Sequence, residues 1–121
     1  MEDETKEKIV IYRVLEILAR FDEPVSEEVR NFIECTATDY LELTWMERNE
    51  ALIMKEAEAD KILINLPIAR KKQLYEIASK LIMIDLLKNK LGLAEILNSR
   101  RFRLFSELQK KYEIPKFNLN Q

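Results

Sequence analysis

Apolar residues recur at intervals of three and four over the first 21 residues, which is the spacing of one helix face. The stripe consists of Ile11, Val14, Leu15, Leu18 and Phe21. The residue before a proline is disfavoured in a helix, so Glu23-Pro24 ends the pattern. We therefore expect a first helix over about residues 2–21.

A shorter amphipathic segment follows. Ser26 has the residue type of an N-cap, and the acidic residues after it suit a first helical turn. The apolar face is supplied by Val29, Phe32 and Ile33. The pattern fades near residue 35, where Thr36 or Thr38 can cap the next helix. These signals predict a short second helix.

The third apolar pattern is long. It runs from about Asp39 to Asn65, with apolar residues seven apart at Trp45, Leu52, Ala59 and Leu66. A seven-residue repeat places these side chains on one seam of a bundle helix, with packing like that of a coiled coil. We expect one continuous third helix whose seam faces the core.

A fourth helix is expected to begin at Pro67, because proline is favoured at the first helical position. A single kinked helix through Pro67 is the alternative. The block from Leu81 to Leu87 is apolar nearly all round, which is typical of a helix covered on most sides. We expect the centre of the core, or an oligomer seam, to be formed by Leu81, Met83, Ile84 and Leu87. Gly92 suits the left-handed position after the helix.

The last apolar stripe runs from Leu93 to about Tyr112, and Ser99 can divide it and cap a final helix. The expected fold is therefore all-α, a helical bundle of about five helices with a long central helix pair. Residues 1–112 form a single helical domain in this interpretation. Residues 113–121 form an extended or disordered C-terminal tail.

Composition agrees with a folded helical chain. Charged residues make up 35% and hydrophobic residues 47% of the 121 positions, with a single glycine. The start of the chain lacks the apolar run of a signal peptide, and the block 81–87 is far shorter than the ~20 residues of a membrane span. We expect a cytoplasmic protein. We expect the single cysteine, Cys35, to be a small buried apolar residue.

Catalytic chemistry finds little support. One glycine cannot build a phosphate-binding loop, and a chain without histidine lacks the commonest general base and most zinc and di-iron ligand sets. Carboxylates that share a helix face, such as Glu47 with Glu50 and Glu56 with Asp60, fit solvated helix surface better than a Mg²⁺ site. We expect no enzyme, no catalytic residues, no cofactor and no metal.

Charge is distributed unevenly along the chain. Residues 1–60 carry 17 acidic and 7 basic side chains, whereas residues 61–121 carry 5 acidic and 13 basic ones. We expect the two halves to lie against each other, with the acidic third helix beside the basic fourth. The basic residues that could contact nucleic acid or an acidic partner are Arg70, Lys71, Lys72, Arg100, Arg101, Arg103, Lys110 and Lys111.

Three short runs stand out in the middle of the chain: Val29-Arg30-Asn31-Phe32-Ile33, Ala59-Asp60-Lys61-Ile62-Leu63 and Arg70-Lys71-Lys72. These runs resemble the helical domain of the GINS replication proteins. The resemblance is confined to these runs, and no residue role is carried over from it.

Two functional hypotheses follow. The first is a non-catalytic protein-interaction or assembly module, acting as a homodimer or as a small subunit of a larger complex. The alternative is an accessory nucleic-acid-binding protein of the replication or transcription machinery, which uses the basic C-terminal half.

Overall fold

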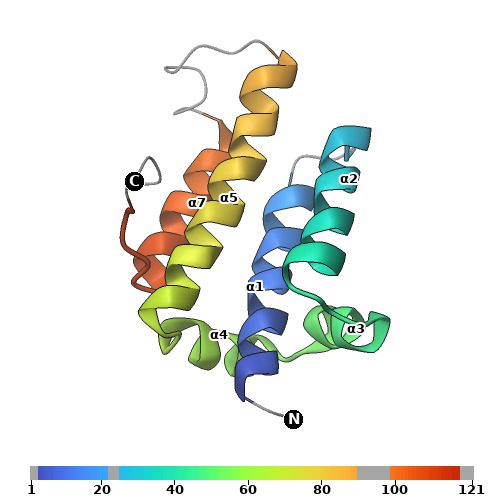
Figure 1. Ribbon diagram of the computed structural model, residues 1–121. Helices are drawn as coiled ribbons and strands as arrows, with labels where there is room; N and C mark the ends of the chain where they lie inside the picture. The colour runs from blue at the N-terminus through green and yellow to red at the C-terminus, as the bar shows by residue number, and fades with distance from the viewer. Residues whose placement is uncertain (1–2, 22–24, 90–98, 118–121) are drawn as a thin grey trace.

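The computed structural model describes residues 3–21, 25–89 and 99–117, without the side chains of 85–89. Within these ranges it contains six α-helices, one π-helical turn and no strand (Figure 1). The elements are α1 (Asp3–Arg20), α2 (Glu27–Cys35), the π turn η1 (Thr36–Tyr40), α3 (Trp45–Ile53), α4 (Glu56–Ile64), α5 (Ile68–Asn89) and α7 (Arg100–Lys111). The predicted all-α bundle is confirmed, with six α-helices in the described ranges instead of about five.

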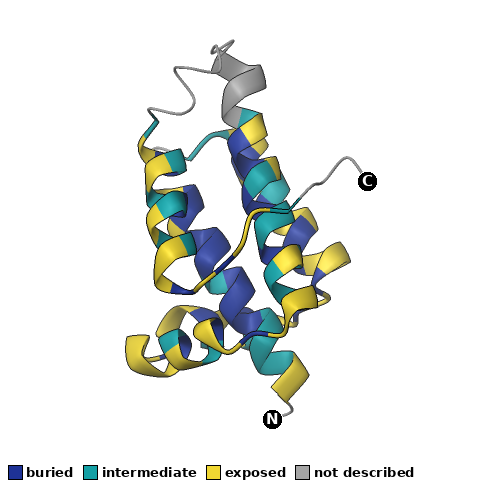
Figure 2. Ribbon diagram, turned by 90° about the vertical axis from the view of Figure 1, so that its left-hand side faces the viewer, coloured by how far each residue is buried: buried dark blue, intermediate teal, exposed yellow. Residues whose placement is uncertain are grey.

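Helix α1 is the centre of the bundle. It packs against each of the other described α-helices, and nine of its 18 residues are buried. In Figure 1, α1, α2, α5 and α7 run side by side, and α3 and α4 lie across the end nearest the N-terminus. Buried positions face the interior of the bundle and exposed positions face outward (Figure 2). The central position in the bundle therefore belongs to α1.

Local capping signals place several helix ends where the sequence predicts them. The Ser26 hydroxyl accepts a hydrogen bond from the Val29 amide, and the Ser99 hydroxyl accepts one from the Phe102 amide, both at 3.2 Å. The Pro67 carbonyl accepts from the amides of Arg70 and Lys71, so α5 begins directly after the proline. The kinked continuous helix is thereby excluded. Residues 22–24 and Gly92 lie outside the described residues.

The long third helix is the main error of the sequence-based prediction. The chain leaves the helical conformation at Met54 and Lys55, whose ψ angles are 139° and 140°, and this divides the segment into α3 and α4. Arg13 of α1 explains the break, because its Nη1 donates to the carbonyl oxygens of Ala51 (3.0 Å) and Met54 (2.8 Å). A side chain from α1 thus satisfies carbonyls that a longer helix would use internally.

The start of α3 also differs from the prediction. The cap is Thr44, not Thr36 or Thr38. Its hydroxyl accepts from the Glu47 amide at 3.1 Å, while the Glu47 carboxylate accepts from the Thr44 amide at 2.9 Å. This capping box fixes the start of α3 at Trp45. Of the four residues in the predicted seam, Ala59 and Leu66 are buried, but Trp45 and Leu52 are exposed.

The apolar block of α5 is only partly in the core. Leu81 is fully buried, Ile84 is half-buried against the core, and Met83 is 47% exposed. Leu87 lies outside the residues whose side chains are described. Leu81 is therefore a core residue, whereas Met83 is turned outward, so a core position is excluded for Met83 and its place in an oligomer seam stays a prediction.

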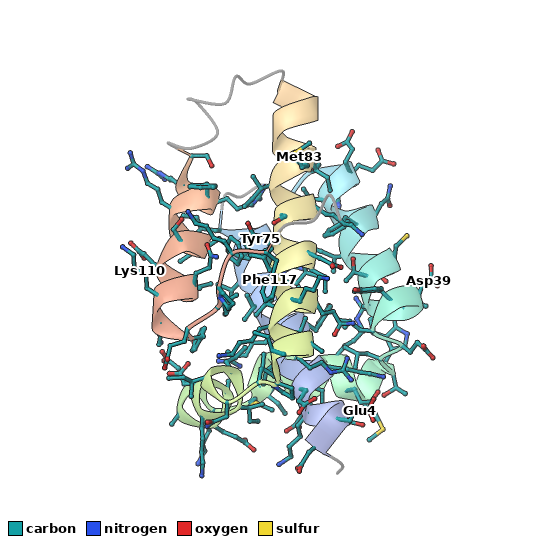
Figure 3. The ribbon with its side chains drawn as sticks, turned by 60° about the vertical axis from the view of Figure 1, so that its left-hand side comes forward. Glu4, Asp39, Tyr75, Met83, Lys110 and Phe117 are labelled. Atoms are coloured by element: carbon teal, nitrogen blue, oxygen red, sulfur yellow. The ribbon has the colours of Figure 1, made fainter. Side chains whose placement is uncertain are left out.

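After α7 the chain packs back along α5. Glu113 takes a left-handed conformation (φ 55°), and the Ile114 amide then donates to the Gln109 carbonyl at 2.8 Å, which closes the helix end. Ile114 is buried, and the Phe117 ring lies 5.7 Å from that of Tyr75, centroid to centroid (Figure 3). The described part of the predicted tail, residues 113–117, is non-helical and covers part of α5.

A candidate interaction surface on helix α3

The outer face of α3 consists largely of exposed apolar side chains. Met46 is 84% exposed, Ile53 75%, Trp45 74% and Leu52 56%. These positions share one side of a nine-residue helix, since residues three, four and seven apart lie on the same face. Neighbouring large apolar residues exposed in this way mark an interaction site more often than isolated ones do.

The inner face of α3 is attached to the bundle by a buried polar group. Arg48, only 7% exposed, donates to both carboxylate oxygens of Glu34 on α2, at 2.7 and 3.0 Å. The same guanidinium donates to the Tyr12 hydroxyl of α1 at 3.1 and 3.2 Å. Tyr12 in turn donates to Glu16, and Arg20 donates to Glu16 at 2.8 Å. Helix α3 is therefore held by directional bonds on one side while its large apolar side chains face out.

This network shifts the pKa values of its members in the directions that hold the bonds. The hydrogen bond from Arg48 lowers the pKa of the Glu34 carboxyl. The hydrogen bond to Glu34 raises the pKa of Arg48 despite the opposing effect of burial. Burial, with the hydrogen bond to Glu16, raises the pKa of Tyr12 to about 12. At neutral pH the network thus combines an ionised Arg–Glu pair with a neutral phenol.

Trp45 is oriented before any partner arrives. The Arg48 guanidinium carbon lies 4.1 Å from the centroid of the Trp45 ring, within the range of a cation–π contact. One face of the indole is thereby occupied, while the side chain as a whole stays 74% exposed. An aromatic side chain already held in place loses little conformational freedom on binding, which suits it as an anchor residue.

The raised pKa of Tyr12 predicts an alkaline loss of stability. Between pH 10 and 12 the unfolded chain releases the phenolic proton while the folded chain keeps it. The stabilisation is fully present below pH 10, and the free energy of unfolding falls as the pH rises towards 12. Urea unfolding across this range should show a steeper fall for the wild type than for Tyr12→Phe. The matched variant Tyr40→Phe, at a half-exposed tyrosine, should keep the wild-type slope.

The predicted basic residues do not form one surface. Arg70 pairs with Glu4 (3.1 Å) and Glu7 (3.2 Å) of α1. Lys71 donates to the Glu113 carbonyl at 3.0 Å. Acidic and basic halves therefore do meet, as expected, although Arg70 pairs with α1 and not with the third segment.

The other junction between the halves joins α4 to α7. Lys111 pairs with Asp60 at 3.3 Å and with Glu56 at 3.7 Å. The Tyr112 hydroxyl donates to the same Asp60 carboxylate, and burial raises the pKa of this tyrosine. The hydrogen bond to Asp60 raises the pKa of Lys111.

Arg101 is a buried structural residue, 4% exposed. Its Nε donates to the Leu18 carbonyl at 2.8 Å and its Nη2 to the Ala19 carbonyl at 3.0 Å. These carbonyls belong to the last turn of α1, whose final four C=O groups have no partner inside the helix. The burial of Arg101 against α1 therefore contradicts the prediction that this side chain contacts nucleic acid.

Arg101→Ala should lower the free energy of unfolding by about 1–3 kcal/mol, because it leaves buried carbonyls without a donor. The matched variant is Arg100→Ala, since Arg100 is exposed and pairs with no group among the described residues. That change should stay within about 0.5 kcal/mol. Urea unfolding of both variants measures the difference, and equal losses would contradict the capping role of Arg101.

Of the remaining basic residues, Lys72 lies on α5, and Arg100, Arg103 and Lys110 lie on the exposed face of α7. Lys72 near the start of α5, and Arg100 and Lys110 at opposite ends of α7, are exposed and pair with no group in the described part of the chain. Arg103 is exposed and has an interaction partner. Lys110 stands on the outer side of α7, at the opposite edge of the molecule from Asp39 (Figure 3). At least half of the eight predicted basic contacts thus serve the fold.

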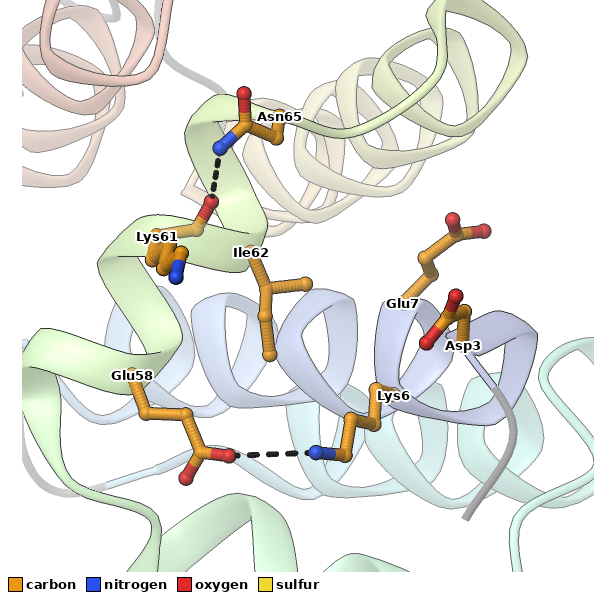
Figure 4. A pocket seen from close by; sticks show the side chains of 7 residues that line it. All are labelled: Asp3, Lys6, Glu7, Glu58, Lys61, Ile62 and Asn65. Atoms are coloured by element: carbon orange, nitrogen blue, oxygen red, sulfur yellow. Dashed lines mark hydrogen bonds and ion pairs between the residues drawn. The ribbon is translucent and has the colours of Figure 1, made fainter.

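A cavity of about 550 Å³ lies between the start of α1 and α4 (Figure 4). Its charged lining alternates in sign, and Lys6 pairs with Glu58 across it at 3.5 Å. The lining residues are Asp3, Lys6, Glu7, Glu58, Lys61, Ile62 and Asn65. Among the described residues no group of three or more His, Cys, Asp or Glu side chains could hold a metal ion.

The prediction that Cys35 is buried is wrong, since it is exposed at the end of α2.

The start of α3 could be predicted from the sequence. The run Thr44-x-x-Glu47 is a capping-box signature directly before an apolar segment. It fixes the start of α3 at Trp45. The seven-residue repeat by itself predicts one long helix and assigns Trp45 and Leu52 to the core.

The chain is thus an all-α helical bundle with an exposed apolar face on α3. None of the described helices combines the length and the apolar character needed to span a membrane. No family model, curated protein or solved structure matches the chain. The resemblance to the GINS helical domain therefore gains no support from a family model.

Proposed function

We propose that the protein is a non-catalytic protein-interaction module, a subunit that binds a partner protein through the outer face of α3. The observation that carries the proposal is the exposed stripe of Trp45, Met46, Leu52 and Ile53 on a helix whose polar bonds point inward. A folded chain exposes such a stripe at the risk of aggregation, and a partner that covers it removes that risk. The sequence has no histidine, and in the described part of the chain no group of carboxylates could hold a metal ion, which agrees with a non-catalytic role.

The test is selection from a displayed library of helix-forming peptides, with the purified chain as the target. Wild-type protein should retain binders. The double variant Met46→Glu/Ile53→Glu should lose them, since a carboxylate at each end of the stripe must be desolvated on docking. Both positions are exposed, so the variant should unfold at the wild-type urea concentration.

The matched control is Met83→Glu/Ile68→Glu. It changes the same residue types at exposed positions of α5 and so also tests the seam predicted around Met83. Binders retained by this control and lost by the α3 variant support the proposal. A library without binders, or binders that do not distinguish the two variants, would overturn it.

A further inference from the structure

The charges in the segment that leads into and through α3 are almost all of one sign. The segment 34–50, which runs from the end of α2 through η1 into α3, contains five carboxylates and a single cation, Arg48. The carboxylates are Glu34, Asp39, Glu42, Glu47 and Glu50. Arg48 is buried and paired with Glu34, so these two charges offset each other and the other four carboxylates set the sign of the segment.

The carboxylates are placed where a docking partner would meet them. Asp39 and Glu42 are exposed in the approach to α3, and Asp39 stands at the outer edge of the molecule (Figure 3). Glu47 and Glu50 lie on the flank of α3 next to Met46, both half-buried. Glu47 caps the helix with its carboxylate and so remains an acceptor at the same place. Past the far end of α3, Lys55 is followed directly by Glu56, so that end adds little net charge.

The shape of the surface favours a helix as occupant. A nine-residue helix is about 14 Å long, which is enough to support about two turns of a partner helix laid along it. Partner helices of this kind present apolar residues at i, i+3 or i+4, and i+7. An apolar stripe beside carboxylates then selects cationic side chains at the rim of the partner.

A second copy of this chain fits the surface poorly. Symmetric pairing of two α3 helices would bring their acidic flanks together, and like charges that face each other across an interface weaken association. The exposed, more basic face of α7 carries Arg100, Arg103, Glu107 and Lys110, without a large apolar side chain. It therefore offers charge but nothing to cover Trp45 and Met46.

Resting on the proposed function, we infer that the α3 stripe and its acidic flank bind a cationic amphipathic helix of a partner protein. The apolar face of that helix covers Trp45, Met46 and Ile53. Its Lys or Arg side chains face Glu42 and Glu50.

The experiment uses two synthetic helical peptides with the same leucine stripe and no tryptophan, one with Lys and Arg and one with Glu beside the stripe. Trp45 is the only tryptophan, so its emission reports binding directly, and burial should shift it to shorter wavelength. At low ionic strength the cationic peptide should bind about tenfold or more tightly than the anionic one. Salt should reduce this preference, because exposed charges are screened.

The charge variant is Glu42→Gln/Glu50→Gln, and its matched control is Glu107→Gln/Glu113→Gln at exposed positions on and after α7. The first should lose most of the preference for the cationic peptide, and the second should keep it. Equal binding of both peptides would overturn the inference and leave the proposed function standing. If neither peptide shifts the Trp45 emission and the library selection yields no binder, the proposed function itself is contradicted. A Trp45 shift that follows protein concentration without peptide would overturn the inference in favour of a second copy.

Discussion

Replacing Leu81 with alanine is expected to lower the free energy of unfolding by about 2–5 kcal/mol. The side chain is fully buried in the core cluster, and α5 packs against α1, α2 and α7. Its removal takes apolar contacts from a close-packed interior and leaves a cavity that these helices cannot fully close. Urea unfolding monitored by far-ultraviolet circular dichroism measures the loss.

Met83→Ala is the matched control on the same helix. Met83 is 47% exposed two residues further on, so its truncation should cost well under half as much as that of Leu81. The loss for Leu81→Ala should not depend on protein concentration, because Leu81 is buried within one chain. A loss below about 0.5 kcal/mol, or one that grows on dilution, would contradict the core position and return Leu81 to an oligomer seam.

Helix ends fixed by neighbouring residues could be predicted from the sequence. Ser26, Pro67 and Ser99 act within three or four residues of themselves, so their signals are complete in the local sequence. The burial of Leu81 was predictable in the same way, because a block that is apolar all round has few orientations that leave it exposed. The all-α class follows from these local signals together.

The division of α3 from α4 could not be predicted in this way. No proline or glycine stands near Met54. The helix ends there because the Arg13 guanidinium, 41 residues away in sequence, donates to the Met54 carbonyl in place of a backbone amide of a longer helix. A prediction from the local pattern therefore extends the helix. It then counts Trp45 and Leu52 as core, although tertiary contacts turn them outward.

The candidate surface was hidden by the same error. The underside of α3 is polar because it binds Glu34 of α2 and Tyr12 of α1, which are remote from Arg48 in sequence. From the local sequence alone, Arg48 is predicted to be a solvated charge, and the apolar residues around it are predicted to form a buried seam. Only the folded structure shows that the side of α3 with Arg48 faces the bundle while its large apolar side chains face outward, the reverse of the usual arrangement.

Arg48→Ala is expected to lower the free energy of unfolding by about 2–4 kcal/mol. The change removes two hydrogen bonds to Glu34 and two to Tyr12, and it leaves the buried Tyr12 hydroxyl without its donors. Breaking a fully buried ion pair typically costs about 3–5 kcal/mol. The smaller value applies because the Glu34 side chain is 54% exposed and can be rehydrated. Arg30→Ala on α2 is the control, since Arg30 is exposed and should change stability by less than about 0.5 kcal/mol.

The acid dependence of stability gives a second readout of the same residue. Arg48 lowers the pKa of Glu34 below its ordinary value of 4.5. The stabilisation is present above pH 4.5 and is lost as the pH falls through the lowered pKa, because the folded chain must then take up a proton that the unfolded chain already holds. In Arg48→Ala this contribution to the acid loss should vanish.

The last expected effect of Arg48→Ala concerns Trp45, whose ring lies against the Arg48 guanidinium. Without that cation the indole is free to change rotamer, so its emission should change in the native protein and the helical peptides should bind more weakly. Arg48→Lys tests the geometry, because an ammonium cannot make the paired bonds to Glu34 and stack on Trp45 together. It should restore little of the stability or of the peptide binding. Full recovery by lysine would show that charge alone holds α3, and that the planar contact between Arg48 and Trp45 contributes nothing to the surface.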